Sequence, residues 1–479
     1  MAEEEICLSR LCLKTIAYCI DRYLDYSIDA CTALYVIGDP FDCLTTENRN
    51  DLLKFLAGSN RLRGPHIGWI VDHNLTHLDL GHSPSLVTHS AMKLISNRCK
   101  LLKYLNIKGS AINGEKLASC LTNLPSLSHL DISSCSGIGS EFTSASVQFP
   151  FHLKSLSIRD CHRFLSDDIG FFLSQPCCES IRKLDLANTS VTDECVGFAV
   201  LTLTSLEWLS LSFCQHVTDP WQFVSWELRL RRIDLSFNSI SDAAIGLLCK
   251  KAVHLKSVNL SGPVHSKELT VTTVSHLATL VDLEELLLAH CSSLTFFAVQ
   301  ESLVDAGKLQ WVVSLDLSAI SDVDCRCLFV KCPALKRLVL DECSNIRYSS
   351  SLDLPRVVHA SLEHVSLRFS TFDSRQSCLD LVASFQEVKT LHFDNSDVLT
   401  DEDILGGAFE KCAQSLVKLS LAKCSQLTCK MLHFVLARMS RLRHLDIFGC
   451  SQMHRKEIEQ IQKNIARQRK QVKIKWPHF

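Results

Sequence analysis

The residues of this chain best suited to chemistry are its 24 cysteines and 20 histidines. Structural zinc sites take cysteines in closely spaced pairs, and no C-x-x-C pair occurs; the nearest approaches are Cys177–Cys178 and Cys325–Arg326–Cys327. Glycine-rich phosphate loops, G-x-S-x-G and H-E-x-x-H sequences are also absent. We therefore expect a chain that is not an enzyme and has no catalytic, metal-binding or cofactor-binding residues.

Most of the cysteines belong to a repeat of the form L-x-x-L-x-L-x-x-C/N. Fifteen such frames lie between Leu75 and Leu442, and their 14 steps average about 26 residues. Leucine-rich repeats have about 20–29 residues, so this period predicts that fold. The frames begin at Leu75, Leu102, Leu127, Leu153, Ile181, Leu206, Leu230, Leu255, Leu283, Val312, Leu335, Leu362, Val388, Leu416 and Leu442.

Each frame predicts a short strand. The apolar fourth and sixth positions point inward, whereas the third, fifth and seventh face outward. A small residue at the ninth position suits a hydrogen bond to the backbone of the neighbouring coil, and a buried thiol is tolerated there as a small hydrophobe. We expect these thiols to be structural and unreactive. The ninth-position cysteines are Cys135, Cys161, Cys214, Cys291, Cys343, Cys424 and Cys450.

A helix is expected between successive strands because a capping sequence recurs there. Ser or Thr caps the first free amide groups of a helix, and Asp in the first turn interacts favourably with the helix dipole. Strand and helix, repeated, predict a right-handed α/β solenoid of about 15 repeats, a horseshoe whose parallel strands line the concave wall. The expected cap pairs are Thr192–Asp193, Thr218–Asp219, Ser241–Asp242, Ser321–Asp322 and Thr400–Asp401.

The combination of C-P-x-L with L-x-L-x-x-C, seen from Cys332 to Cys343, resembles the cysteine-containing subtype of leucine-rich repeat. That subtype is known from F-box/LRR ubiquitin-ligase receptors and from the antagonist-of-mitotic-exit-network family. The resemblance covers about residues 75–450. It implies the solenoid fold and, less specifically, a role in binding a protein substrate, because repeats of this kind serve many partners.

Composition favours a cytoplasmic or nuclear protein. The chain is 46% hydrophobic with a formal net charge of −2, which favours neither specific nucleic-acid binding nor an acidic membrane surface. Its start, Met1 to Glu5, is acidic where a signal peptide is basic, and no apolar run approaches the roughly 18 residues of a membrane span. We expect three parts: a helical N-terminal cap or adaptor segment at 1–60, repeats at 70–453, and a capping helix with an edge strand at 454–479.

The N-terminal segment carries the clearest functional motif. Leu8, Cys12 and Ile16 are four residues apart and share one face of a predicted helix at 5–24. This L-x-x-x-C-x-x-x-I spacing resembles the BC box by which substrate receptors grip elongin C. In that box the leucine enters a pocket and the small cysteine permits close approach. Cys7 departs from the box, which prefers Ser, Thr, Ala or Pro before the leucine.

A second helix, predicted at 47–56, follows the first. The stretch 44–53 resembles the cullin-contact box of Zyg-type LRR receptors, except that Thr45 replaces a proline and Asn48 an apolar residue. An F-box is the rival interpretation, because it also precedes such repeats and would recruit a Skp-type adaptor. Residues 5–60 lack its leucine-proline start and its aromatic second half. A plain cap without an adaptor is the remaining alternative.

The concave wall is the expected surface for a protein substrate. Asp recurs at the fifth frame position, which is ordinary for this subtype, so residues that break the pattern are more informative. Exposed aromatic and arginine side chains dominate interface energies. The predicted substrate-binding residues are Arg159, Trp208, Phe213, Arg232 and Phe237, with a second group of Arg368, Phe369 and His392. Packing of Phe213 against Phe237 as a structural spine is the alternative for that pair.

These patterns favour a non-catalytic protein-binding scaffold that serves as substrate-recognition subunit of a cullin-RING ubiquitin ligase. Its partners would be elongin B/C or a Skp-type adaptor, together with a cullin. The alternative is an LRR scaffold or inhibitor unconnected with ubiquitin.

Overall fold

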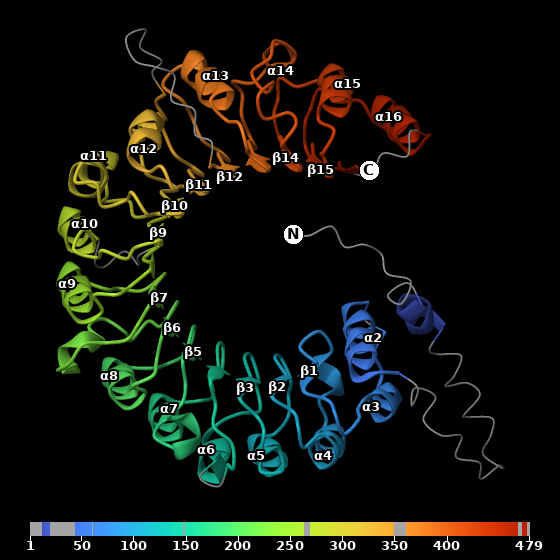
Figure 1. Ribbon diagram of the computed structural model, residues 1–479, viewed down its shortest axis with the longest axis vertical. Helices are drawn as coiled ribbons and strands as arrows, with labels where there is room; N and C mark the ends of the chain where they lie inside the picture. The colour runs from blue at the N-terminus through green and yellow to red at the C-terminus, as the bar shows by residue number, and fades with distance from the viewer. Residues whose placement is uncertain are drawn as a thin grey trace. The chain divides into compact units, whose positions relative to one another are not determined.

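The computed structural model describes residues 12–19, 44–59, 61–146, 149–262, 269–348, 361–467 and 472–476. The chain forms two compact units, Met1–Leu230 and Arg231–Phe479. In each unit, short parallel strands alternate with helices along the chain, and the helices lie on one side of the strands (Figure 1). None of the helices in the described ranges has the length and apolar character needed to cross a membrane.

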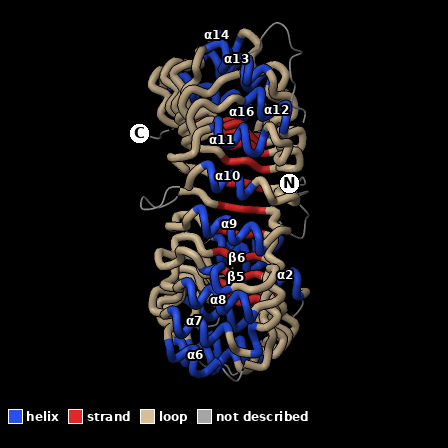
Figure 2. The backbone as a smooth tube through the Cα atoms, turned by 90° about the vertical axis from the view of Figure 1, so that its left-hand side faces the viewer, coloured by secondary structure: helices blue, strands red, loops and turns tan. Residues whose placement is uncertain are grey.

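The described residues of the first unit include six parallel strands that pair in chain order, the last two of which are labelled in Figure 2. Two helices, α2 (Thr46–Gly58) and α3 (Gly64–Ile70), precede them. The strands are β1 (His77–Asp79), β2 (Tyr104–Asn106), β3 (His129–Asp131), β4 (Ser155–Ser157), β5 (Lys183–Asp185) and β6 (Trp208–Ser210). The connecting helices are α4 (His89–Arg98), α5 (Gly114–Leu121), α6 (Ser140–Ser146), α7 (Ser166–Leu173) and α8 (Asp193–Thr202), with the 3₁₀ turns η1 (Pro84–Leu86), η2 (Pro176–Cys178) and η3 (Pro220–Phe223).

The described residues of the second unit repeat this arrangement with ten strands that also pair in chain order. The strands are β7 (Arg232–Asp234), β8 (Ser257–Asn259), β9 (Glu285–Leu287), β10 (Ser314–Asp316), β11 (Arg337–Val339), β12 (His364–Ser366), β13 (Thr390–His392), β14 (Lys418–Ser420), β15 (His444–Asp446) and β16 (Lys473–Lys475). The helices are α9 (Asp242–Lys251), α10 (Val271–Leu277), α11 (Phe296–Val299), the π-helical η4 (Gln300–Val304), α12 (Cys325–Lys331), α13 (Arg375–Ala383), α14 (Asp401–Leu405), α15 (Cys429–Arg438) and α16 (Arg455–Arg467).

The fifteen strands predicted from the frames are confirmed as β1–β15, and each occupies the third to fifth frame positions. The fourth and sixth positions of every frame are at most 2% exposed. Strands pair with identical positions aligned, so that Leu315 of β10 lies between Leu286 of β9 and Leu338 of β11. Each unit is therefore an α/β leucine-rich-repeat array whose core is a column of such apolar side chains. The face that carries the third and fifth positions, away from the helices, is called the open face below.

Buried thiols join successive coils. Each of the seven ninth-position cysteines donates its S–H to the carbonyl oxygen of the sixth position in the preceding frame, with S···O distances of 3.1–3.5 Å. Cys161, for example, donates to Ile132 over 3.2 Å. Burial raises the pKa of Cys161 and of Cys424 to about 12, so these thiols stay protonated and poorly nucleophilic.

The recurrent aspartates of the fifth position also serve the backbone. In each of the six frames with Asp at the fifth position, the carboxylate accepts the N–H of the residue two positions later, as Asp316 does from Ser318 over 3.0 Å. Asn106 and Asn259 make the same bond where asparagine replaces aspartate. These side chains close the turn after the strand, which explains their recurrence without a ligand.

The helix starts were predicted correctly at Thr192, Ser241 and Thr400, which cap α8, α9 and α14. The prediction was wrong at Thr218, because the N–H and hydroxyl of this residue bind the Asp193 carboxylate and only a proline-led 3₁₀ turn follows. It was also wrong at Ser321. Asp322 there adopts a left-handed conformation (φ 60°), and Asp324 caps α12 instead.

The burial of the cysteines predicts a sharp difference in thiol labelling. Of the 21 described cysteines, all but Cys12, Cys19 and Cys327 are buried, and three more of the 24 lie outside the described residues. We expect at most six thiols to react with a water-soluble disulfide reagent in the native chain and all 24 to react in denaturant. Mass spectrometry would identify the labelled sites. Rapid native labelling of Cys161 or Cys424 would contradict the assignment of these thiols to the core.

Candidate functional site: the open face and the N-terminal helix

Three of the predicted substrate-binding residues surround β5 in the first unit. Trp208, on β6, is half-buried, and the Lys183 ammonium lies over its ring at 4.6 Å from the centroid. Arg159 follows β4; its side chain is 45% exposed and lies 3.6 Å from the Asp160 carboxylate. Phe213 is 44% exposed. The aromatic and cationic groups of this face are therefore accessible to a partner.

The other two predicted residues, Arg232 and Phe237, belong to the second unit. Arg232 starts β7 and is exposed. Phe237 is 38% exposed, and a Cβ atom at Gly262 would approach its ring to 2.4 Å. The ring therefore lies against the glycine of the next coil, and residue 262 must remain glycine. Phe237 thus contributes to packing between coils while part of its surface stays exposed.

The eighth frame position has a conformation that we did not predict. In fourteen of the fifteen frames this residue has a positive φ, between 52° and 78°. In twelve of these frames its N–H donates to the seventh-position carbonyl of the next coil, as Phe369 does to Asp394 over 2.9 Å. Glycine at 109, 262 and 449 was the sequence signal that could have revealed it, because glycine adopts this region freely.

A phenylalanine in this left-handed conformation lowers the stability of the fold. A left-handed L-residue costs roughly 1–2 kcal/mol, and bulky side chains are rare there. Three frames nevertheless place an exposed phenylalanine at this turn: Phe213, Phe237 and Phe369. Because this conformation recurs in fourteen frames, it belongs to the fold; the exposed aromatic rings at three of these turns are what make Phe213, Phe237 and Phe369 interface candidates.

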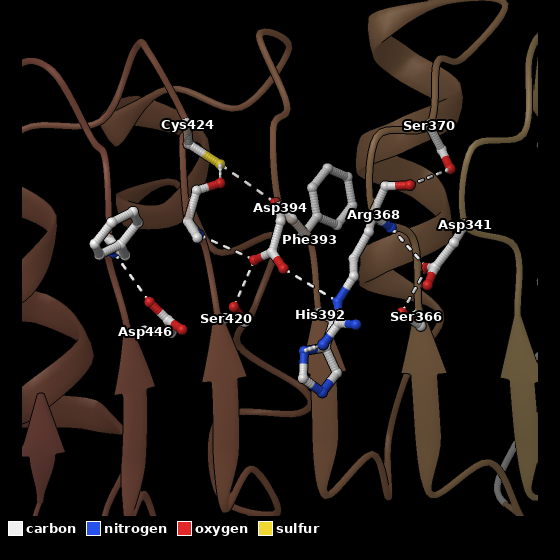
Figure 3. A network of polar contacts seen from close by, with 12 residues as sticks. Asp341, Ser366, Arg368, Ser370, His392, Phe393, Asp394, Ser420, Cys424 and Asp446 are labelled. Atoms are coloured by element: carbon white, nitrogen blue, oxygen red, sulfur yellow. Dashed lines mark hydrogen bonds and ion pairs between the residues drawn. The ribbon is translucent and has the colours of Figure 1, made fainter. Parts of the chain in front are cut away.

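A polar network occupies the open face at β12–β14 of the second unit (Figure 3). The Arg368 guanidinium donates to Nδ1 of His392 over 2.7 Å and lies 3.1 Å from the Asp394 carboxylate. Asp394 also accepts from the Ser420 hydroxyl and from the N–H of Ala422. Arg368 and His392 of the second predicted group are thus brought together from two adjacent coils, and Phe369 follows Arg368 in the chain. Asp394 and Ser420 were missed, because nothing in a single frame predicts contacts across three coils.

Electrostatics keeps His392 neutral. Burial, followed by the charges of Arg368 and Lys418, lowers the pKa of His392 to about 4. With Nδ1 accepting from Arg368, the hydrogen of the neutral ring is on Nε2, which is therefore a donor. Beside this network is a hollow of about 150 Å³ whose polar lining residues are Arg337, Asp341, His364, Ser366, Arg368, Thr390 and His392.

The predicted adaptor helix is described only over residues 12–19, so Leu8 lies outside the described residues. Leu13 and Ala17 are buried, at 3% and 4% exposure. Lys14 lies 5.4 Å from the ring centroid of Phe55 in α2. The helix therefore packs on the chain through the face that carries Leu13 and Ala17. Cys12 is exposed and Ile16 half-buried, so among the described residues the cysteine of the predicted motif is not part of the core.

Helix α2 is held in the first unit by a cap, by buried leucines and by a buried arginine. Thr45, which departs from the cullin-contact box, accepts the N–H of Asn48 and caps this helix. Leu52 and Leu56 are fully buried. Arg49 is only 3% exposed; its guanidinium donates to the Leu44 carbonyl and lies 3.6 Å from the Asp72 carboxylate. The segment 44–58 is thus part of the folded first unit.

Comparison with known proteins identifies the fold. No family model and no curated protein sequence matches the chain. Among solved structures, Rad7 of yeast, crystallised in complex with Elc1, is 17% identical over 94% of this chain and 95% of its own, with a TM-score of 0.51. An internalin of Listeria monocytogenes is 16% identical over 86% of this chain and 98% of its own (TM-score 0.42). An LRR protein of Leptospira interrogans is 17% identical over 85% and 91% (TM-score 0.36).

Fifteen in-register frames, the parallel strands that they form and the buried thiols between coils agree with this likeness. The chain is a leucine-rich-repeat protein.

Proposed function

We propose that the chain is a non-catalytic scaffold that binds a protein on its open face and serves as the substrate-recognition subunit of a cullin-RING ubiquitin ligase. In this proposal the N-terminal helix binds elongin C through Leu8, Cys12 and Ile16. A cullin completes the assembly.

The exposure of Cys12 carries the proposal. A helix that served only as a cap would turn its apolar stripe toward the repeats. Here Leu13 and Ala17 fill that role, and Cys12 is left at the surface of an ordered helix. A small side chain at an exposed helical position permits the close backbone approach that the BC-box resemblance implies. Rad7, which shares this fold, was crystallised with a second protein, Elc1, and that complex makes the adaptor test worth performing first.

The test is co-purification of elongin B/C with the full chain and with two variants of equal bulk. We expect Cys12→Phe to abolish elongin C binding, because a large ring blocks close approach. Lys14→Phe should retain it, since this exposed residue lies beside Phe55, where a ring is readily accommodated. Both variants should melt within a few degrees of the wild type.

Two outcomes would overturn the proposal. If the wild type binds no elongin C, the adaptor role fails; capture of a Skp-type adaptor would then support the F-box alternative, and capture of neither would leave a scaffold unconnected with ubiquitin. If Cys12→Phe and Lys14→Phe bind elongin C equally well, the exposed cysteine is not part of the contact.

A further inference from the structure

The open face of β11–β14 has two cations that pair with no carboxylate of the described residues. The third positions of neighbouring strands form a row, in which Arg337 lies beside His364 and Thr390 lies beside Lys418. Arg337 and Lys418 are exposed, and within the described ranges neither forms an ion pair with a carboxylate. Such a row attracts negative charge.

The two carboxylates nearby accept hydrogen bonds from other groups of the chain. Asp341 accepts the Ser366 hydroxyl over 2.5 Å and the N–H of Arg368 over 2.9 Å. Asp394 accepts from Ser420 and Ala422 and lies against the Arg368 guanidinium. Both acidic groups therefore stabilise the turns after β11 and β13 and keep their negative charge. Among the lining residues, the one carboxylate of Asp341 stands against the two guanidinium groups of Arg337 and Arg368, so the excess charge at the hollow is positive.

Donors converge on the hollow beside these cations. Arg337, Arg368, Thr390 and His392 all line it. Arg368 is held by His392 and Asp394, so its guanidinium is fixed in place while its side chain is still 41% exposed. The neutral His392 ring adds its Nε2–H as a donor. Planar guanidinium groups with additional N–H donors suit the oxygens of a carboxylate or phosphate.

Two exposed aromatic rings lie in the same unit, outside the lining of the hollow. Phe369, one residue after Arg368, is 47% exposed in its left-handed conformation, and the Lys423 ammonium lies 5.6 Å from its ring centroid. Further along, Phe448 is 44% exposed, with Lys475 at 5.6 Å from its ring. An extended segment that places an oxyanion in the hollow can rest apolar side chains on these rings.

We propose that the hollow between β11 and β13 binds an oxyanion-bearing side chain, phosphorylated or carboxylic, of an extended protein segment whose apolar neighbours contact Phe369. This inference deepens the proposed function by stating the chemistry of the bound partner, and it rests on that function only for the role of the partner as a substrate. Arg337 and Arg368 bind the oxyanion, and Lys418 adds attraction at longer range.

The test uses three fluorescent nine-residue peptides with the same glycine and phenylalanine sequence around one central residue, which is phosphoserine, glutamate or serine. Anisotropy with the full chain should show the phosphoserine or the glutamate peptide binding at least about tenfold more tightly than the serine peptide. The stronger of the two identifies the oxyanion. Arg337→Gln should weaken that peptide about tenfold without changing the melting temperature, since Arg337 is exposed. Lys331→Gln, which removes an exposed cation at the end of α12, is the matched control and should change nothing.

Equal binding of all three peptides would overturn the inference, as would equal affinities of Arg337→Gln and Lys331→Gln for the oxyanion peptide. A single-stranded oligouridine that displaces the peptide, with both variants weakened alike, would also overturn it by showing general attraction to polyanions. Because elongin C takes no part in these measurements, failure here leaves the adaptor proposal standing, and failure of the adaptor test leaves this site standing.

Discussion

Replacing Leu315 by arginine is expected to yield insoluble or partly unfolded protein. Leu315 is fully buried in β10, between Leu286 of β9 and Leu338 of β11, and Leu317 beside it is fully buried too. A guanidinium placed there would have no partner and no water, which costs several kcal/mol. Each coil of a repeat protein is stabilised by its neighbours, so the damage should spread to adjacent coils of the second unit.

The matched control is Ser314→Arg. Residue 314 precedes Leu315 in the same strand but faces the open side, where it is half-buried between Glu285 of β9 and Arg337 of β11. We expect this variant to be purified in wild-type yield and to melt within a few degrees of the wild type by circular dichroism. If Leu315→Arg behaved in the same way, the assignment of the fourth frame position to the core would be wrong.

Sequence reasoning succeeds here wherever one property recurs at one position. The strands were predicted because apolar residues at the fourth and sixth positions are required in every coil. The ninth-position thiols were predicted to hydrogen-bond the backbone of the neighbouring coil, and all seven do so. A residue preference that is weak evidence for structure in one frame thus becomes strong evidence when it recurs at the same position in fifteen frames.

The same reasoning fails where one frame departs from the rest. Ser321 and Asp322, before α12, match the capping sequence. Asp322 has a left-handed conformation, however, and the helix begins only at Cys325. The pair of Arg49 and Asp72, 23 residues apart, lies outside the repeats, so no period indicates it. Likewise, Arg368, His392 and Asp394 meet only because adjacent coils place different frame positions side by side. The predicted grouping of Trp208 with Arg232, which lie in different units, remains a prediction.

Replacing Arg49 by methionine is the second change expected to have a large effect. Its side chain is 4% exposed and lies 3.6 Å from the Asp72 carboxylate, which is itself only 18% exposed and accepts the N–H of Asn74. Removing the cation leaves a poorly solvated carboxylate without its counter-charge, which costs about 3–5 kcal/mol. Asp72 precedes β1, so this loss should loosen α2 and the adjoining helix at 12–19. Thermal melts and hydrogen exchange of α2 would measure it.

Two controls separate the buried pair from an ordinary surface contact. Arg182 and Glu207 form a pair in the same unit at 3.5 Å, with side chains 64% and 44% exposed, so Arg182→Met should cost no more than about 1 kcal/mol. Adding Asp72→Asn to Arg49→Met should recover the part of the loss that comes from the buried carboxylate, while the hydrogen bond from Arg49 to the Leu44 carbonyl stays lost. Equal effects of Arg49→Met and Arg182→Met would show that the Arg49 pair is solvated. The helix at 12–19 lies against α2, where Lys14 meets the Phe55 ring. Arg49→Met should therefore also weaken the binding of a partner to the N-terminal helix.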